Sequence, residues 1–329
     1  MSERSVLLTG ASGLIGRHVA KKVAALDGSR LVCILRDGTG HPQAQSLMRD
    51  GAVVVPGNFY EPAVIEKVFE EHKIRQVIHL AAIRGGGKAA TEDFQEVNVK
   101  GTERLLRAAH DRKAEKFVFC SSVGVYGTIP TNMPAGLESP FRGDNQSHQS
   151  KIEGEEAVQT YIRKGLNAYI VRPTITYGAG DDGFPHALVH LVRKRLLWLP
   201  RSNHRVHLVD VERLAEAFCN LIANDYPSQR VFVVGDIEST TLRDLADWIH
   251  LHFYRCPYPT YFRLPDWVFG LAFRLFQSIR NEKWMARMAL LSNDWHYESA
   301  DAYRLLGIRP VPTREAFDRF LNETATAPR

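Results

Sequence analysis

The chain has 329 residues, of which 44% are hydrophobic and 24% charged, so it can bury the core of one large domain or of two ordinary ones. Its formal net charge of +5 suits an anionic small-molecule ligand, and the lack of a long basic run argues against nucleic-acid binding. Four widely spaced cysteines show no disulfide or metal-ligand pattern, so we expect a cytoplasmic protein without a metal site. The first predicted strand begins by Ser5 and no apolar run reaches spanning length, so we expect neither a signal peptide nor a membrane span.

A glycine-rich turn separates the first predicted strand, Val6–Thr9, from the first predicted helix, 14–26. Glycines let a backbone approach an anion closely, and the amides and dipole of a helix N-terminus attract negative charge. The turn therefore predicts a loop that binds a pyrophosphate. The alternative is a strand–helix turn that is rich in glycine for packing alone. The residues assigned to the loop are Gly10, Ser12, Gly13, Leu14, Ile15 and Gly16.

Strand-like and helix-like segments alternate through the first half of the chain. The predicted strands are apolar at consecutive positions, which is typical of a parallel sheet with helices on both faces. The alternation predicts an α/β fold, a Rossmann doubly wound parallel sheet with a smaller mixed C-terminal substrate lobe. We place the NAD(P)-binding domain at 1–172 and the lobe at 173–329, and segments such as 206–235 are expected to return to the first domain. The remaining strands are predicted at Leu31–Leu35, Ala52–Val55, Gln76–Leu80, Lys116–Ser121, Ala168–Val171 and Val231–Val234, and the remaining helices near 62–72, 91–113 and 147–164.

Ligands of such sheets bind at the carboxyl ends of the strands, so the residues that follow the second and third strands are informative. Arg36 ends the second strand and Asp37 follows it. An arginine there can pair with a 2′-phosphate, whereas an acidic residue would accept hydrogen bonds from a ribose. We therefore favour NADP(H) over NAD(H); an exposed arginine with no ligand is the alternative. Asn58 and Phe59 follow the third strand, where the Asn58 amide could cover the adenine.

The ends of the fourth and fifth strands carry the other candidates. Leu80, Ala81 and Ala82 follow the fourth strand, where small residues either leave room for a flat ring or serve helix packing. A basic loop at 83–88 comes next, at the mouth of the same site. Ser121 and Ser122 end the fifth strand, at the carboxyl edge of the sheet.

Two segments of the second half have a clear pattern. Leu264–Phe276 is an apolar helical stretch with Pro265 at its start, and we expect it to pack in the core of the smaller lobe. A helix on a membrane surface is the alternative, weakened by its few charges. Asp301–Gly307 and a helix ending near Glu323 are expected to close the fold.

Seven segments in order resemble the extended short-chain dehydrogenases/reductases of the NAD(P)-dependent epimerase/dehydratase type, and the resemblance runs almost end to end. One such segment would be weak, but seven at compatible distances make the resemblance specific. They are Thr9–Gly16, His79–Ala82, Asn98–Thr102, Ser121–Gly127, Arg172–Gly178, Arg205–Val211 and Leu306–Pro310.

The resemblance implies a Ser or Thr after the fifth strand, and a Tyr and a Lys four residues apart on the next helix. Ser122 and Lys151 take the first and last roles, but Ser147 stands where the family has its tyrosine. A phenol has a pKa of about 10 that neighbours can lower, whereas an aliphatic alcohol is a weaker acid and reaches less far. Tyr126, or a water held by Ser122 and Lys151, could substitute. An imidazole can exchange protons near neutral pH, but His148 lies about 100° further around the helix.

The resemblance also assigns cofactor and substrate contacts. Lys151 would hold the nicotinamide ribose, the backbone at Pro173, Thr174 and Ile175 would face the carboxamide, and Asn98 would join the cofactor site. Arg205 matches an arginine that meets a nucleotide-sugar phosphate. The implied substrate contacts are Arg84, Ser122, Thr176 and Arg205.

Two functions follow from this pattern. The first is an NADP(H)-dependent reductase, dehydrogenase or epimerase/dehydratase that acts on a carbonyl or alcohol, including that of a nucleotide sugar. The second is a non-catalytic, dinucleotide-binding sensor or partner protein that has lost its tyrosine. By resemblance, either would form a homodimer through the helices at 91–113 and 147–164.

Overall fold

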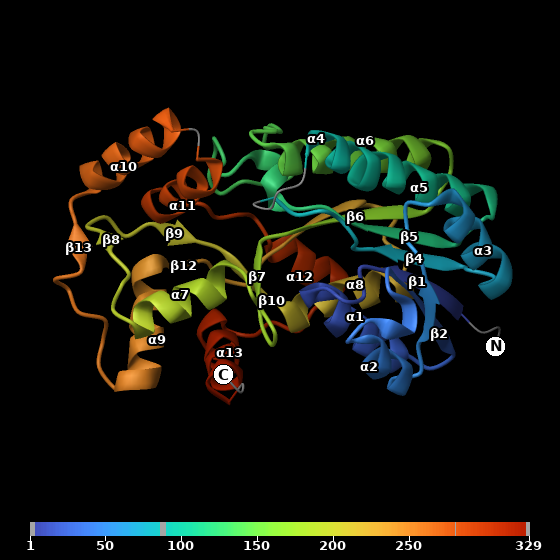
Figure 1. Ribbon diagram of the computed structural model, residues 1–329, viewed down its shortest axis with the longest axis horizontal. Coiled ribbons are helices and arrows are strands. Elements are labelled where there is room, and N and C mark those ends of the chain that lie inside the picture. Colours follow the sequence, from blue (N-terminus) through green and yellow to red (C-terminus); the bar gives the residue numbers. More distant parts are fainter. Residues whose placement is uncertain (1–3, 86–89, 280, 327–329) are drawn as a thin grey trace.

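The computed structural model describes residues 4–85, 90–279 and 281–326. A seven-stranded parallel sheet crosses its larger half in the order β11-β6-β5-β4-β1-β2-β3 (Figure 1). The chain runs outward from β1 through β2 to β3, then returns to the other side of β1 for β4, so strand order reverses between β1 and β4. In such sheets ligands bind at the carboxyl ends beside this reversal. The strands are β1 Arg4–Thr9, β2 Ser29–Leu35, β3 Val53–Pro56, β4 Gln76–His79, β5 Lys116–Cys120, β6 Ala168–Pro173 and β11 Val231–Val234.

Helices cover both faces of this sheet, and the predicted Rossmann fold is confirmed. One face carries α1 Leu14–Ala24, α2 Ala44–Arg49, α8 Val211–Ala223 and α12 Ala300–Leu306; the other carries α3 Pro62–His72, α5 Gly101–Asp111 and α6 Gln146–Arg163. The predicted helix near 91–113 is three consecutive pieces, α4 Thr91–Asp93, a π-helix at Phe94–Lys100 and α5. Short 3₁₀ helices lie at Gly38–Gly40 and Val123–Tyr126.

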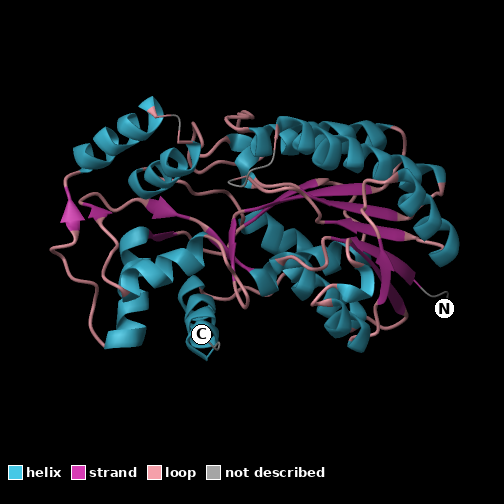
Figure 2. Ribbon diagram, viewed as in Figure 1, coloured by secondary structure: helices cyan, strands magenta, loops and turns pink. Residues whose placement is uncertain are grey.

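The second lobe is mostly helical and has its own core (Figure 2). Its helices are α7 Phe184–Arg193, α9 Leu242–Tyr254, α10 Asp266–Ser278, α11 Glu282–Ser292 and α13 Thr313–Thr326. Three pairs of short strands link them: β7 Ile175–Tyr177 with β10 Leu208–Asp210, β9 Arg205–Val206 with β12 Thr240–Thr241, and β8 Leu199–Pro200 with β13 Arg263–Leu264. The chain crosses between the two parts, because α8 packs on α1 and β11 is an edge strand of the large sheet.

The expectation that Leu264–Phe276 packs in the lobe core is wrong. The helix forms as α10, but Phe269 is its one buried residue within the described part of the chain. Trp267, Leu271 and Leu275 are instead 68, 61 and 58% exposed. An apolar sequence predicts a helix with an apolar surface, but it does not determine whether another element covers that surface.

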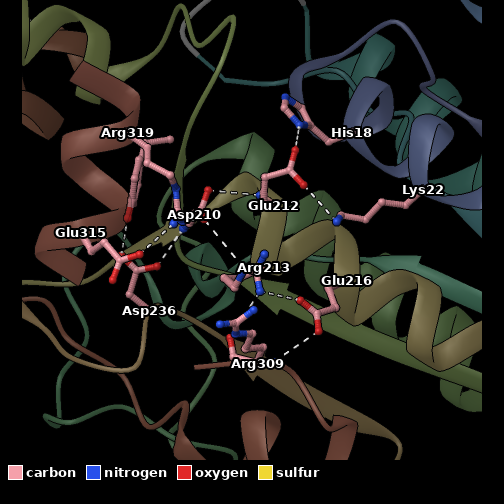
Figure 3. Close-up of polar contacts among 11 residues, drawn as sticks. His18, Lys22, Asp210, Glu212, Arg213, Glu216, Asp236, Arg309, Glu315 and Arg319 are labelled. Atoms are coloured by element: carbon pink, nitrogen blue, oxygen red, sulfur yellow. Dashed lines mark hydrogen bonds and ion pairs between the residues drawn. The ribbon is translucent and has the colours of Figure 1, made fainter. Parts of the chain in front are cut away.

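Polar side chains link α1 with α8 and β10 with α13 (Figure 3). Glu212 at the start of α8 pairs with His18 and Lys22 of α1, at 2.6 and 3.0 Å. The hydrogen bond with His18 and the ammonium of Lys22 lower the pKa of Glu212 to about 2. Asp210 at the end of β10 accepts a bond of 3.1 Å from Arg319 of α13. These contacts hold α1, α8 and α13 in one arrangement.

Candidate functional site

The glycine turn after β1 has no room for side chains at two of its glycines. Gly10 has φ of +75°, and a Cβ on it would lie 2.7 Å from the backbone nitrogen of Ala81, just after β4. A Cβ on Gly16 would lie 2.0 Å from the carbonyl oxygen of Gly10. Gly13 precedes α1, whose first turn leaves amide groups without an intrahelical acceptor. The turn therefore presents backbone at the reversal point of the sheet, as an anion-binding loop requires.

Arg17 is a candidate that sequence reasoning missed. It lies in the first turn of α1, and its guanidinium donates a hydrogen bond of 3.1 Å to the carbonyl of Gly180. A Cβ on Gly180, which has φ of +79°, would lie 2.5 Å from the same guanidinium. Arg17 thus adds a positive charge beside the glycine turn and ties it to the loop after β7. A basic residue directly after the third glycine was the available signal, but it resembles any helical arginine.

The tips of β2 and β3 lie on the far side of the turn from β4. Arg36 is exposed where β2 ends, and Asp37 beside it is exposed as well. Asn58 donates its amide to the carboxylate of Glu61, so one side of this amide is already occupied. The Phe59 ring packs 5.0 Å from the buried imidazole of His79, measured between ring centres. This places an aromatic ring beside His79 at the end of β4 and an exposed cation at the tip of β2.

The end of β4 is held by buried polar contacts. His79 contacts the hydroxyls of Thr9 and Thr102, at 2.7 and 2.9 Å. Burial and the nearby ammonium of Lys151 lower the pKa of His79 to about 3, so the ring is neutral and holds the strand in place. The half-buried Leu80, Ala81 and Ala82 follow it.

Asn98 supports this segment from below. Its amide oxygen accepts from the backbone of Ile83 at 2.7 Å, and its amide nitrogen donates to the Ile83 carbonyl and to Ser150 at 3.0 and 2.9 Å. The residue is 3% exposed. Protein groups therefore occupy both the oxygen and the nitrogen of this amide. Asn98 was predicted to contact the cofactor directly, but here it positions the loop after β4. The rest of the predicted basic loop, 86–88, lies outside the described residues.

Tyr126 does not reach the carboxyl edge of the sheet, which corrects its assignment as a substitute proton donor. It is 1% exposed, and its hydroxyl accepts a hydrogen bond of 2.6 Å from Arg172. Arg172 forms a two-bond ion pair with Glu155 at 2.9 and 2.6 Å, and Ser121 donates to the same carboxylate. Burial raises the pKa of Tyr126, which makes it a poorer acid. The four residues join β5, α6 and β6 beneath the site.

Ser122 and Lys151 lie above that buried group. The Ser122 hydroxyl oxygen accepts from the amide of Gly124 at 3.0 Å, which leaves its hydrogen free to donate. Lys151 donates to the carbonyl of Cys120 at 2.7 Å, and its ammonium lies 5.0 Å from the centre of the Phe119 ring. Burial lowers the pKa of Lys151. The structure thus places a hydroxyl and a desolvated ammonium at the end of β5.

Ser147 is the second residue of α6, the helix that also carries Lys151, and it is half-buried. The loop after β4 packs on it, because a Cβ on Gly85 would lie 3.2 Å from the Ser147 Cβ. His148, the next residue, turns toward the segment after Ser122, where a Cβ on Gly124 would lie 2.5 Å from its ring. Its Nδ1 pairs with Asp144 at 2.6 Å. Burial alone would raise the pKa of Asp144, but the bonds with His148 and Thr128 outweigh it and lower the pKa to about 2.

The end of β6 closes the site on the other side. Thr174 is 4% exposed, and its hydroxyl has no hydrogen-bond partner among the described residues. Pro173 is buried before it and Ile175 is half-buried after it. The Thr176 hydroxyl donates back to the Thr174 carbonyl at 3.3 Å. A buried, unsatisfied hydroxyl is costly, so the Thr174 hydroxyl is suited to a hydrogen bond with a polar ligand group.

The predicted substrate arginines lie apart from one another. Arg84 is exposed after β4 and approaches Asp182 at 3.8 Å, across from the loop that follows β7. Arg205 is exposed on β9 and donates to the hydroxyl of Ser239 at 3.3 and 3.1 Å. It lines a separate pocket with Thr313 and Arg314. The two arginines therefore do not form a single anion site in this arrangement.

The sheet order and the glycine turn at its reversal point define an α/β protein of Rossmann type. The profile of the NAD dependent epimerase/dehydratase family matches residues 6–235, and the chain belongs to this family. The membership predicted from the seven segments is confirmed.

Individual relatives show how far the similarity extends. UDP-glucose 4-epimerase of Rhizobium meliloti (strain 1021) is 29% identical over 186 residues, which cover 56% of this chain and 55% of that protein. The chain thus matches about half the length of this relative. A 4-hydroxy-2-methyl-3-oxo-4-farnesyl-3,4-dihydroquinoline-1-oxide ketoreductase of Stigmatella aurantiaca is 25% identical over 239 residues, covering 72% of this chain and 69% of that protein. The crystal structure of UDP-glucuronic acid 4-epimerase from Bacillus cereus in complex with NAD superposes over 98% of both chains, with a TM-score of 0.75 and 18% identity, which supports the fold.

Proposed function

We propose that the chain is an NAD(P)-dependent oxidoreductase or epimerase/dehydratase that acts on a carbonyl or alcohol carbon, and that it prefers NADP(H). One observation carries the proposal: the glycine turn, which has no room for side chains, lies at the same edge of the sheet as Ser122 and Lys151. Nucleotide sugars are the first substrate class to test, because the relative from Rhizobium meliloti is a UDP-glucose 4-epimerase.

The residues at this edge fit a dinucleotide. Gly10 and Gly16 form a cradle that a Cβ would fill, and Arg17 supplies a cation beside it. The unsatisfied Thr174 hydroxyl supports a polar ligand group at the end of β6. When bound, the cofactor would supply hydride transfer at its nicotinamide. Arg36 would pair with a 2′-phosphate, and Lys151 has two ammonium hydrogens left for ribose hydroxyls.

The proton is expected to move by an atypical route. Tyr126 is buried on Arg172, and Ser147 is a weak acid held under Gly85. Ser122 can donate to a substrate oxygen through its free hydrogen. Burial lowers the pKa of Lys151, which makes its ammonium a better proton donor, directly or through a water. We therefore expect turnover through Ser122 and Lys151 that is slow beside that of an enzyme with the family's tyrosine.

A second candidate function rests on Ser147 alone. If neither Ser122 nor Lys151 replaces the lost phenol, the chain would bind the dinucleotide without turning over a substrate. It would then act as a sensor or as a partner protein whose contacts depend on the bound cofactor. The same glycine turn supports this alternative, so binding by itself does not separate the two.

Titration of the full chain with NADPH and NADH by fluorescence tests the cofactor. We expect tighter binding of NADPH, and Arg36→Ala should weaken NADPH by tenfold to a hundredfold, since hydrogen bonds to charged groups contribute about 1.5–3 kcal/mol. Arg49→Ala is the matched control, because Arg49 is equally exposed on α2 and should leave both affinities unchanged. If neither dinucleotide binds, both candidate functions fail.

Turnover separates the two functions. With simple ketones, absorbance at the reduced nicotinamide band should show cofactor consumption by a reductase. With nucleotide sugars, chromatography of the products should show conversion by an epimerase or dehydratase, which returns its cofactor unchanged. Ser122→Ala should reduce either activity. Binding of NADPH without turnover of any of these substrates would instead support the sensor. Ser147→Tyr tests the impaired site further, although the Gly85 segment must shift to admit the ring.

The proposal includes a cytoplasmic homodimer and a division into domains at 1–172 and 173–329. Helices α5 and α6 lie side by side in the outer layer of the sheet and offer the expected dimer face (Figure 1). Sedimentation velocity of the full chain measures the oligomeric state.

A further inference from the structure

Helix α10 lies at the end of the second lobe (Figure 1), and several of its large apolar side chains are exposed. Trp267, Leu271, Leu275 and Ile279 follow at four-residue steps and are 68, 61, 58 and 61% exposed. Residues four apart share one face of a helix, so these side chains form a single stripe, about 18 Å long at 1.5 Å per residue. A helix whose core-facing side and outer side are both apolar is expected to pack against another element or partner on each side.

Large aromatic side chains are also exposed on the segments before and after α10 and just before β8. Trp284 of α11 is 41% exposed and stacks on Phe276 of α10, with ring centres 5.5 Å apart. Tyr261, 66% exposed, and Trp198, 44% exposed, both contact the ring of Phe262. We call Trp198, Tyr261, Trp267, Leu271, Leu275, Ile279 and Trp284 the α10 surface. Seven large exposed apolar residues in neighbouring elements exceed the scattered apolar residues of an ordinary protein surface.

The sequence around α10 is rich in positive charge. The segment 255–292 contains six Lys and Arg residues and two Asp and Glu residues, a net charge of +4 in a chain whose total is +5. Arg274 is exposed on α10 itself, and the Arg287 guanidinium lies 4.7 Å from the centre of the Trp284 ring. Within residues 4–85, 90–279 and 281–326, no ion pair involves the exposed Arg274 or Arg287. These cations are therefore available to an anionic partner.

We propose that the α10 surface docks on the headgroup region of an anionic lipid bilayer. The α10 surface is an apolar helical stripe with Trp and Tyr at its borders and Arg beside it, which matches the polarity of the headgroup region. In that region the aliphatic part of an arginine lies along the apolar layer and its charge reaches the lipid phosphates. No helix in the described part of the chain is long and apolar enough to cross a membrane. The helix lies in the surface of the bilayer.

Charge decides between a bilayer and a second copy of this chain. A two-fold contact through the α10 surface would bring two segments of net charge +4 against each other, because such an interface pairs the same patch with itself. An anionic lipid surface would instead attract the same positive charges. Docking also leaves the glycine turn uncovered, since α1 and β1 lie in the larger half of the molecule, away from α10 (Figure 1).

Vesicle flotation with the full chain tests this proposal. The probes are vesicles of phosphatidylcholine with 30% phosphatidylglycerol and vesicles of phosphatidylcholine alone. We expect flotation with the anionic vesicles, at least tenfold weaker binding to the neutral ones, and weakening by salt. The double variant Leu271→Ser and Leu275→Ser should reduce binding at least tenfold, and Arg274→Glu should reduce it selectively for anionic vesicles.

Matched controls keep the test interpretable. Met48→Ser with Leu137→Ser removes two apolar residues that are 50 and 42% exposed elsewhere, and it should bind vesicles as the unaltered chain does. Equal melting temperatures would show that the α10 variants fold. The proposal is overturned if the unaltered chain binds neither vesicle, if it binds both equally, or if the Leu271 and Leu275 variant abolishes self-association in place of vesicle binding.

Discussion

Replacing Glu155 by leucine is expected to destabilise the protein strongly, because it leaves a buried guanidinium without its partner. The side chains of Glu155 and Arg172 are 3 and 5% exposed, and two hydrogen bonds of 2.9 and 2.6 Å join them. Removing one member of a buried pair costs about 3–5 kcal/mol. Ser121 also loses its acceptor, for about 1 kcal/mol more. A loss of about 4–6 kcal/mol is a large part of the 5–15 kcal/mol typical of folded proteins.

A second variant separates the ion pair from the packing around it. Glu155→Leu with Arg172→Met replaces both charges by apolar groups of similar size, and it should recover most of the loss, to within about 1–2 kcal/mol of the original stability. Glu156→Leu is the matched control, since Glu156 is the next residue of α6 and is exposed, and it should change stability by less than about 0.5 kcal/mol.

Urea unfolding followed by far-UV circular dichroism measures these differences. Lys151 lies one turn before Glu155 on the same face of α6, so the single variant should also weaken dinucleotide binding. A loss below about 1 kcal/mol in the single variant, or no recovery in the double variant, would refute the reasoning.

Two further predictions concern the glycine turn and the junction of the lobes. Gly16→Ala puts a methyl group 2.0 Å from the Gly10 carbonyl, so it should cost about 1–3 kcal/mol and reduce dinucleotide affinity at least tenfold in a fluorescence titration. Gly40→Ala, with open space around it, is the control. Asp236 follows β11 and accepts hydrogen bonds of 2.8 Å from the Tyr177 hydroxyl and the Asp210 amide, and burial raises its pKa to about 8, above its unfolded value. The stabilisation by its neutral form is complete below pH 4 and lost as pH rises through about 8. The melting temperature should therefore fall from pH 7 to 9, and Asp236→Asn should flatten that fall; an unchanged profile would contradict it.

Local pattern was sufficient to predict the framework of this protein. Consecutive apolar residues predicted β1, β2 and β11, because a strand covered on both faces has few polar positions. Gly10, Gly13 and Gly16 predicted a turn between strand and helix, because a side chain cannot fit where backbone must approach so closely. The Rossmann fold and the family follow from these local features and their order.

The environment of individual side chains was decided by tertiary packing. Tyr126 follows Ser122 by four residues and was an apparent proton donor, yet Arg172 from β6 takes its hydroxyl into the core. Asn98 carries an amide suited to a cofactor, but Ile83 and Ser150 occupy both of its ends. Each contact comes from a segment distant in the chain, which no local pattern contains.

The sequence by itself determined that 264–276 forms an apolar helix, and the tertiary structure alone decided that α10 is uncovered. Helical periodicity records which side chains share a face. Whether another element covers that face depends on where the rest of the chain goes, and here the chain leaves the Trp267–Ile279 stripe exposed. The same distinction holds at the site: the glycine turn is a local feature, whereas its neighbours Ser122, Lys151 and Thr174 meet it only because β1, β5 and β6 end at one edge of the sheet.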